Sequence, residues 1–391
     1  MASIPRRWIG RLGIATLLVS LGVAAAALSA SGDAPTAAPD VGAFAIEQQA
    51  ASAPPGLYVS GARVTERTKE RTSTKQLDNA ALAPLLGKGS PVAVPSPDGR
   101  LLAYNSWRST GPTGGTPTLR LFDFASSADI VLARGAQAPA WRHDGSLAYE
   151  QADAPAFGST APYQRRILVR DSASASPTVW TARADLYGVI GWAGDRLIVG
   201  RASPDGQSGE LLAFDRPNSS HLLAVNSGLV AISPDGAHVL VSDGGPGLST
   251  PLRLRLLDVT DGSETASLVL ADEIGPSSGG QVEWVDVPGS WRGDLVVMTA
   301  SPGLLVVRVG DKSVKAEQVL GLDLRQIGTD GVYEPRFVDG TTRIVLWGNS
   351  PEGTTPRTFQ LDCDRVALTC LRGPDTLAAS RPAYDRSGGT E

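Results

Sequence analysis

The stretch SPDGRLLAYNS, residues 96–106, decides the fold that the sequence predicts. Its Asp98-Gly99 pair favours the positive φ of a tight hairpin turn, and the apolar run 101–104 after it predicts a short strand. The same order returns along the chain: an aromatic or apolar residue, an Asp turn and an apolar strand. The turn acids of the copies are Asp98, Asp144, Asp195, Asp235, Asp294 and Asp339.

The number of copies predicts the architecture. A third strand follows each second strand after a loop of variable length, and a fourth is visible in places. Four short strands per copy, in six copies, predict an all-β fold, a β-propeller with six four-stranded blades. Residues 56–90 precede the first full copy and either complete the last blade or form a degenerate seventh; six is the preferred number. A tandem of β-sandwiches explains the strands but not the recurring turn.

The copies resemble the blades of TolB-like and WD40-like bacterial propellers. Ser-Pro-Asp-Gly is intact at 96–99 and at 233–236 and degraded in the other copies, and the resemblance covers about residues 90–375. The Gly-His and Trp-Asp signature of the eukaryotic repeats is absent. The resemblance implies a fold and almost nothing about function.

The amino-terminal residues have the pattern of a targeting segment. Three basic residues, Arg6, Arg7 and Arg11, precede the uncharged stretch 12–30, which predicts an export signal at 1–30. Retention as a membrane anchor over 12–30 is the alternative, since this stretch nearly spans a bilayer. The expected location is therefore outside the cytoplasmic membrane, in the envelope or the medium. We expect 31–55 to be a flexible Ala/Pro-rich linker, 56–378 the propeller and 379–391 a tail.

The chain has two cysteines, Cys363 and Cys370, at the end of a predicted third strand and in the fourth. A hairpin brings residues at this spacing within disulfide range. The exported location is oxidising, and an even cysteine count in an exported chain favours pairing. We predict a structural disulfide.

Residues that carry chemistry are sparse. The three histidines, His143, His221 and His238, lack metal-ligand spacing, and no Gly-x-Ser-x-Gly motif occurs. The acids of the Asp-Gly turns are expected to be turn formers. The net charge of −5 does not favour nucleic acid as a partner. The sequence therefore predicts no catalytic residue, no cofactor and no metal.

Binding is the preferred function: an exported, non-catalytic, monomeric propeller that binds a protein or cell-envelope ligand through its interblade loops. The first candidates are Trp107 and Arg108, expected in a long loop after a second strand, followed by Trp180 and Trp291-Arg292. Packing of these tryptophans between blades is the competing interpretation. The alternative function is an envelope hydrolase or lyase with carboxylates at the central pocket, so enzymatic activity stays open, with the sequence favouring none.

Overall fold

The structure is a computed structural model. The described residues are 39–48, 56–60, 63–67, 72–76, 93–109, 115–152, 164–202, 209–243, 253–270, 289–300, 303–329, 331–338, 340–350, 357–373, 376–377 and 381–384. All of the described residues belong to one compact unit, Ala38–Glu391. The predicted export signal and anchor lie outside the described residues. Within those residues, no helix has the length and apolarity to cross a membrane.

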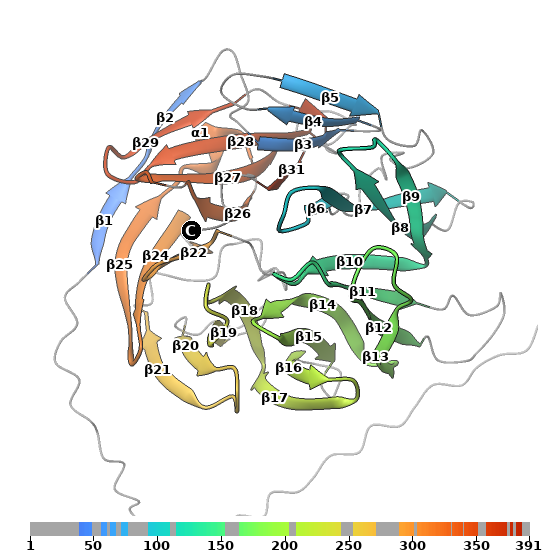
Figure 1. Cartoon of the computed structure of the whole chain (residues 1–391). Helices are drawn as coiled ribbons and strands as arrows, with labels where there is room; N and C mark the ends of the chain where they lie inside the picture. Colours follow the sequence, from blue (N-terminus) through green and yellow to red (C-terminus); the bar gives the residue numbers. More distant parts are fainter. Residues whose placement is uncertain are drawn as a thin grey trace, which may run out of the picture. The chain divides into compact units, whose positions relative to one another are not determined.

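The described strands form seven sheets, and six of them each contain four consecutive antiparallel strands (Figure 1). Sheet 1 contains β6 (Ala93–Pro95), β7 (Leu101–Ser109), β8 (Gly115–Asp123) and β9 (Asp129–Arg134). Sheet 2 contains β10 (Ala136–Trp141), β11 (Leu147–Ala152), β12 (Arg165–Arg170) and β13 (Thr178–Arg183). Sheet 3 contains β14 (Leu186–Ala193), β15 (Arg196–Ala202), β16 (Gly209–Arg216) and β17 (Ser219–Val225).

Sheets 4 to 6 continue the series. Sheet 4 contains β18 (Ser227–Ile232), β19 (His238–Asp243), β20 (Arg253–Asp258) and β21 (Glu264–Val269). Sheet 5 contains β22 (Trp291–Arg292), β23 (Leu295–Ala300), β24 (Gly303–Gly310) and β25 (Ser313–Gly321). Sheet 6 contains β26 (Val332–Phe337), β27 (Arg343–Ser350), β28 (Arg357–Asp364), β29 (Thr369–Arg372) and the short β30 (Thr376–Leu377). A short helix, α1 (Leu324–Ile327), connects sheets 5 and 6. The all-β expectation is confirmed.

The seventh sheet corrects two expectations. It consists of β31 (Arg381–Tyr384), β3 (Gly56–Ser60), β4 (Arg63–Arg67) and β5 (Thr72–Gln76), in that order. The segment before the first repeat therefore forms a separate sheet and does not complete the sheet of the last repeat. Residues 381–384, expected in a tail, pair with β3. The sequence did not indicate a strand here, because β31 is not part of a repeat copy and its partner β3 lies near the other end of the sequence.

The linker prediction is also wrong in part. Residues 40–48, expected in a flexible linker, form β1 (Asp40–Ala43) and β2 (Ala45–Gln48). β1 is a fifth strand of sheet 5, parallel to β25, and β2 is a fifth strand of sheet 6, parallel to β29. Low hydrophobicity suggested a solvated chain, but small side chains also allow a close approach to a sheet edge.

Successive sheets pack face to face, because each strand sends alternate side chains to opposite neighbours. In β11, Leu147 and Tyr149 join a cluster with sheet 1, whereas Ala148 joins a cluster with sheet 3. Further clusters connect sheet 3 with 4, sheet 4 with 5 and sheet 5 with 6. The hydrophobic core is thus divided among the gaps between sheets.

The tryptophan before a turn connects the first strand of its own sheet to the first strand of the preceding sheet. Trp141 Nε1 donates to the Val94 carbonyl of sheet 1 at 2.9 Å, and Trp192 Nε1 donates to the Ala140 carbonyl of sheet 2 at 3.1 Å. Both tryptophans pack against the hydrophobic clusters between adjacent sheets.

The disulfide prediction is also confirmed. Cys363 in β28 and Cys370 in β29 are directly opposite in register and form a disulfide. Both are buried in the core between sheets 5 and 6.

Candidate functional site

The two ends of the sheets differ in construction. The first and third connections of sheets 1 to 6 lie at one end, here called the turn end. The second connection, between the second and third strands, lies at the opposite end, here called the loop end.

The turn end holds the Ser-Pro-Asp-Gly motifs. Asp98 accepts hydrogen bonds from the Ser96 hydroxyl at 2.5 Å and from a backbone N–H two residues on at 3.0 Å. Asp235 repeats this geometry with the Ser233 hydroxyl at 2.6 Å and a backbone N–H at 3.0 Å. The serine hydroxyl stabilises the ionised carboxylate and so lowers the pKa of each aspartate. These acids form turns, as predicted.

Asp144 fits the same role, whereas the carboxylates of Asp195 and Asp294 pair with Arg142 and Arg308. Asp144 accepts the backbone N–H of Ser146 at 2.9 Å and pairs with Arg142, which lowers the pKa of Asp144. Arg142 also lies over the ring of Trp192, with its guanidinium carbon 5.1 Å from the ring centroid. Asp339 lies outside the described residues.

A cavity of about 390 Å³ opens at the turn end between sheets 3 and 4, and Asp195, Asp215, Asp235 and Asp258 are among its lining residues. Asp215 accepts from Arg196 Nε at 2.7 Å, and His221 Nε2 donates to a backbone carbonyl at 2.9 Å. Within the described residues, no three His, Cys, Asp or Glu side chains are grouped so that they could hold a metal ion. Asp235 and Asp258 of this cavity accept backbone N–H groups of their own turns, whereas Asp215 pairs with Arg196.

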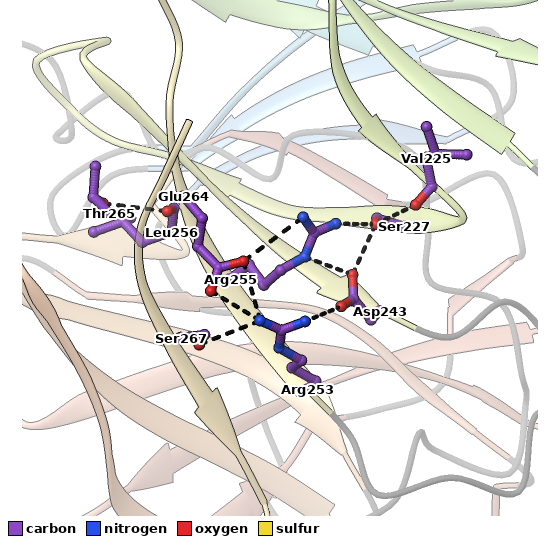
Figure 2. Close-up of polar contacts among 9 residues, drawn as sticks. All are labelled: Val225, Ser227, Asp243, Arg253, Arg255, Leu256, Glu264, Thr265 and Ser267. Atoms are coloured by element: carbon purple, nitrogen blue, oxygen red, sulfur yellow. Dashed lines mark hydrogen bonds and ion pairs between the residues drawn. The ribbon is translucent and has the colours of Figure 1, made fainter. Parts of the chain in front are cut away.

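The loop end of sheet 4 carries a network of arginines and acids (Figure 2). Arg255 donates from Nε to Asp243 Oδ1 and from Nη2 to Ser227 Oγ, both at 2.8 Å. Arg253 donates to Glu264 Oε1 at 2.9 Å and lies 3.5 Å from Asp243 Oδ2. The carboxylate of Asp243 therefore contacts both guanidinium groups.

Strand periodicity explains how β20 presents these arginines. In its sequence RLRLLD, Arg253 and Arg255 alternate with Leu254 and Leu256, which are buried in the core between sheets 4 and 5. Asp243, the last residue of β19, lies directly opposite Arg253 in the register. Alternation therefore assigns the leucines to the core and the arginines to the polar network.

Sheet 3 repeats the chemistry at its own loop end. Arg201 and Glu210 are register partners in β15 and β16, and Arg201 Nε donates to Glu210 Oε2 at 2.7 Å. At the start of the connection from β13 to β14, Arg183 makes a bidentate contact with Asp185, with both distances 2.8 Å. Bidentate arginine–carboxylate pairs fix the plane of the guanidinium.

Sheet 2 contributes a buried carboxylate. Glu150 of β11 lies 3.3 Å from Arg165 Nη1 of β12. Its Oε2 also contacts sheet 3: a Cβ added to Gly188 of β14 would lie 2.7 Å from this oxygen, and Gly188 has φ +146°. Burial raises the pKa of Glu150, and Arg165 and Gln137 oppose this rise.

The exposed fractions reveal a common orientation. The exposed fractions of the two side chains, arginine first, are 29% and 1% in Arg165–Glu150, 48% and 35% in Arg183–Asp185, and 19% and 9% in Arg201–Glu210. They are 42% and 30% in Arg253–Asp243, and 42% and 33% in Arg253–Glu264. In each of these pairs the arginine is the more exposed partner. Arg255, at 18% against 30% for Asp243, is the exception. Four arginines of sheets 2 to 4 are thus more exposed than the acids that hold them, and Arg100–Asp123 and Arg343–Asp362 of the turn end share this orientation.

The predicted binding residues lie elsewhere than expected. Trp107 and Arg108 are in β7, with Pro117 and Thr116 of β8 as register partners, and not in a loop. The hairpin of β7 and β8 extends further than the apolar run indicated, because its outer part is polar. Their side chains lie outside the described part of the structure, so their role in binding stays a prediction. Arg108 is the penultimate residue of its strand, as Arg201 is in β15.

The other tryptophan candidates pack within the fold. Trp180 in β13 is only 8% exposed and meets Trp192 edge to face, with ring centroids 5.5 Å apart. Trp291 packs against the core between sheets 4 and 5, and its Nε1 donates to the Gly293 carbonyl at 3.0 Å. For these two, packing between sheets is the correct interpretation.

Sequence reasoning missed the arginine–acid pairs of the loop end. The alternation in β20 was a visible signal for the two arginines there. Pairing of Arg165 with Glu150 and of Arg201 with Glu210 had no such signal, because the partners come from different strands whose register the sequence does not state.

Comparisons with known proteins concern the fold. No family model and no curated protein matches the sequence. The chain is similar to the β-propeller domain of the Trilobed protease from Pyrococcus furiosus, with 14% identity, 70% of this chain and 83% of that chain covered, and TM-score 0.41. It is also similar to puromycin hydrolase, with 14% identity, 86% of this chain and 53% of that chain covered, and TM-score 0.49. A putative TolB from Agrobacterium tumefaciens matches with 15% identity, 70% of this chain and 95% of that chain covered, and TM-score 0.36. The chain spans about half the length of the puromycin hydrolase.

Proposed function

We propose that this protein is a binding propeller whose ligand, a protein with exposed carboxylates, docks at the loop end of the sheets. The observation that carries this proposal is the orientation of the arginine–acid pairs of sheets 2 to 4. Arginine presents five N–H donors in a planar fork that matches a carboxylate, and it is enriched at protein interfaces. Guanidiniums already held by neighbouring acids lose little side-chain freedom when a ligand arrives.

The proposal includes a closed ring of seven blades. Sheet 7 combines β3 from near the amino terminus with β31 from near the carboxyl terminus, and β31 lies beside β6 of sheet 1. Closure by strands from both ends of the chain removes the open edges that a linear row of sheets would have. Such a ring places all the loop ends on one face. Deletion of residues 379–391, which include β31, tests closure by its effect on unfolding.

The most exposed loop-end arginines provide the test of binding. Arg183→Gln with Arg253→Gln removes two outward guanidiniums, and we expect at least a tenfold loss of affinity for a partner captured from native envelope. The matched control is Arg100→Gln at the turn end, where the arginine is 64% exposed and pairs with Asp123 at 3.2 Å. Binding is measured by titration at two salt concentrations, because contacts between charges weaken with salt.

Two results would overturn the proposal. Equal loss of binding in the turn-end control assigns the ligand to a different face. Turnover of an envelope glycan or ester by the purified protein supports instead the alternative of a hydrolase or lyase. The buried Glu150 is the first carboxylate to change in that case, because burial raises its pKa toward that of a general acid.

A further inference from the structure

The segment Asp40–Gln48, here called the strap, crosses from sheet 5 to sheet 6. Its first half, β1, aligns Asp40 with Gln318 and Ala43 with Gly321 of β25. Its second half, β2, runs parallel to β29. Figure 1 shows β1 beside β25, the outer strand of sheet 5, and β2 beside β29, the outer strand of sheet 6.

Phe44, between β1 and β2, anchors the strap. Its N–H donates to the Gly321 carbonyl at 3.0 Å, and the N–H of Ala45 donates to the Leu368 carbonyl at 2.9 Å. The phenyl ring is 5% exposed and belongs to the core cluster shared by sheets 5 and 6. The aromatic side chain therefore fills the gap between two sheets, while the flanking backbone pairs with the edge of each.

Small residues allow this close approach. A Cβ added to Gly42 would lie 2.9 Å from Leu368 Cδ2, and one added to Gly321 would lie 3.6 Å from the Ala43 Cβ. Val41 is 80% exposed, so the opposite face of β1 faces solvent. The strap has the pattern of a peptide that extends a sheet: main-chain pairing along its length and one buried anchor.

We propose that the strap is bound as a peptide ligand, through contacts that hold it without the covalent connection from Gln48 to Gly56. The edges of β25 and β29 form its site, and the site takes an extended segment with small residues around a single aromatic side chain. This inference does not depend on the proposed function. Its consequence is that residues 40–48 are held at the outer edges of sheets 5 and 6 independently of β3.

The short connection strengthens docking in the intact protein. Seven residues, 49–55, separate β2 from β3. A short covalent link gives a local concentration of about millimolar, so even a modest peptide affinity keeps the strap docked. Docking must therefore be measured after this link has been cut.

The experiment uses the full chain with residues 49–55 replaced by a specific protease site of equal length. After folding and cleavage, we expect the fragment that ends at residue 48 to co-elute with the rest of the chain. A labelled synthetic peptide of residues 39–48 should exchange into the site. The peptide with Phe44→Ala should bind at least about 100-fold more weakly, because its anchor is lost. The matched control peptide, Val41→Ala, changes a solvent-facing residue and should bind within about twofold of the native peptide.

The proposal is overturned if the cleaved fragment separates at micromolar protein and the native peptide does not rebind. Equal competition by the Phe44→Ala and Val41→Ala peptides also overturns it. Hydrogen exchange on the uncut protein gives an independent check that requires no variant. The amides of Phe44 and Ala45 should be protected as strongly as those of β25, and exchange at the rate of an unstructured peptide contradicts docking.

Discussion

The Asp-Gly turns of the turn end and the arginine–acid pairs of the loop end both use carboxylates, to different effect. At the turn end, Asp98 and Asp235 bond to the serine and backbone N–H of their own turns. At the loop end, Asp243 and Glu210 bond to arginines on neighbouring strands. The first arrangement satisfies local backbone and closes a hairpin, whereas the second orients side chains at the surface. A carboxylate therefore serves its own turn or holds an arginine of a neighbouring strand, according to which strand provides its partner.

The largest effect that distinguishes the ends is expected from glycine replacement. Gly188→Ala places a methyl against Glu150 and adds backbone strain, so it should lower the free energy of unfolding by roughly 3 kcal/mol. Gly145→Ala at the turn end is the control: φ is +88°, but a Cβ meets nothing within 4 Å, so only strain of about 1 kcal/mol is expected. Urea unfolding of both variants measures the difference, and equal losses would show that Glu150 adapts freely.

The disulfide, near the turn end of sheet 6, should have the next largest effect. Replacement of Cys363 and Cys370 by serine removes a short cross-link, and we expect a loss of about 2 kcal/mol in unfolding free energy. Ile46 of the strap is the register partner of Cys370, so exchange of the strap peptide should also become faster. Calorimetry and peptide exchange test the two parts separately. A stability loss with unchanged exchange limits the role of the disulfide to the hairpin of β28 and β29.

A charge deletion tests whether the loop-end pairs are more strongly coupled than those of the turn end. Asp243→Asn weakens the contacts of both Arg253 and Arg255, and we expect a loss of about 1.5 kcal/mol. Asp215→Asn at the turn end weakens a pair in which both side chains are substantially exposed, so the change should stay below about 0.5 kcal/mol. Denaturant titrations at low and high salt measure both, and the reverse order would contradict the comparison.

The smallest expected effect is on the pH dependence of stability, to which Glu150 at the loop end and the turn aspartates contribute with opposite signs. The raised pKa of Glu150 means that the folded state binds the extra proton, so its contribution to stability decreases as pH rises from about 4.5 through the folded-state pKa. The lowered pKa of Asp98 and of Asp235 has the opposite sign: their stabilisation is present above the ordinary value of 3.8 and is lost as pH falls through the folded-state pKa.

Two variants separate these contributions. Glu150→Gln should gain stability relative to the wild type as pH rises above 4.5, and Asp98→Asn should lose stability relative to the wild type as pH rises through 3.8. Unfolding curves collected between pH 3 and pH 8 make the comparison. Parallel pH profiles for Glu150→Gln and the wild type would show that Glu150 has an ordinary pKa.

The sequence by itself determined the local structure: the turns, the short apolar strands, their repetition and the pairing of Cys363 with Cys370. These features depend on residues close together in the chain, namely Asp-Gly turns, alternation and a short cysteine spacing. The tertiary structure alone decided that β31 joins β3, that the strap docks on sheets 5 and 6, and that Glu150 lies against Gly188 of the next sheet. Such contacts join residues far apart in sequence, and they depend on strand register and on the close packing of neighbouring sheets, which no local pattern encodes.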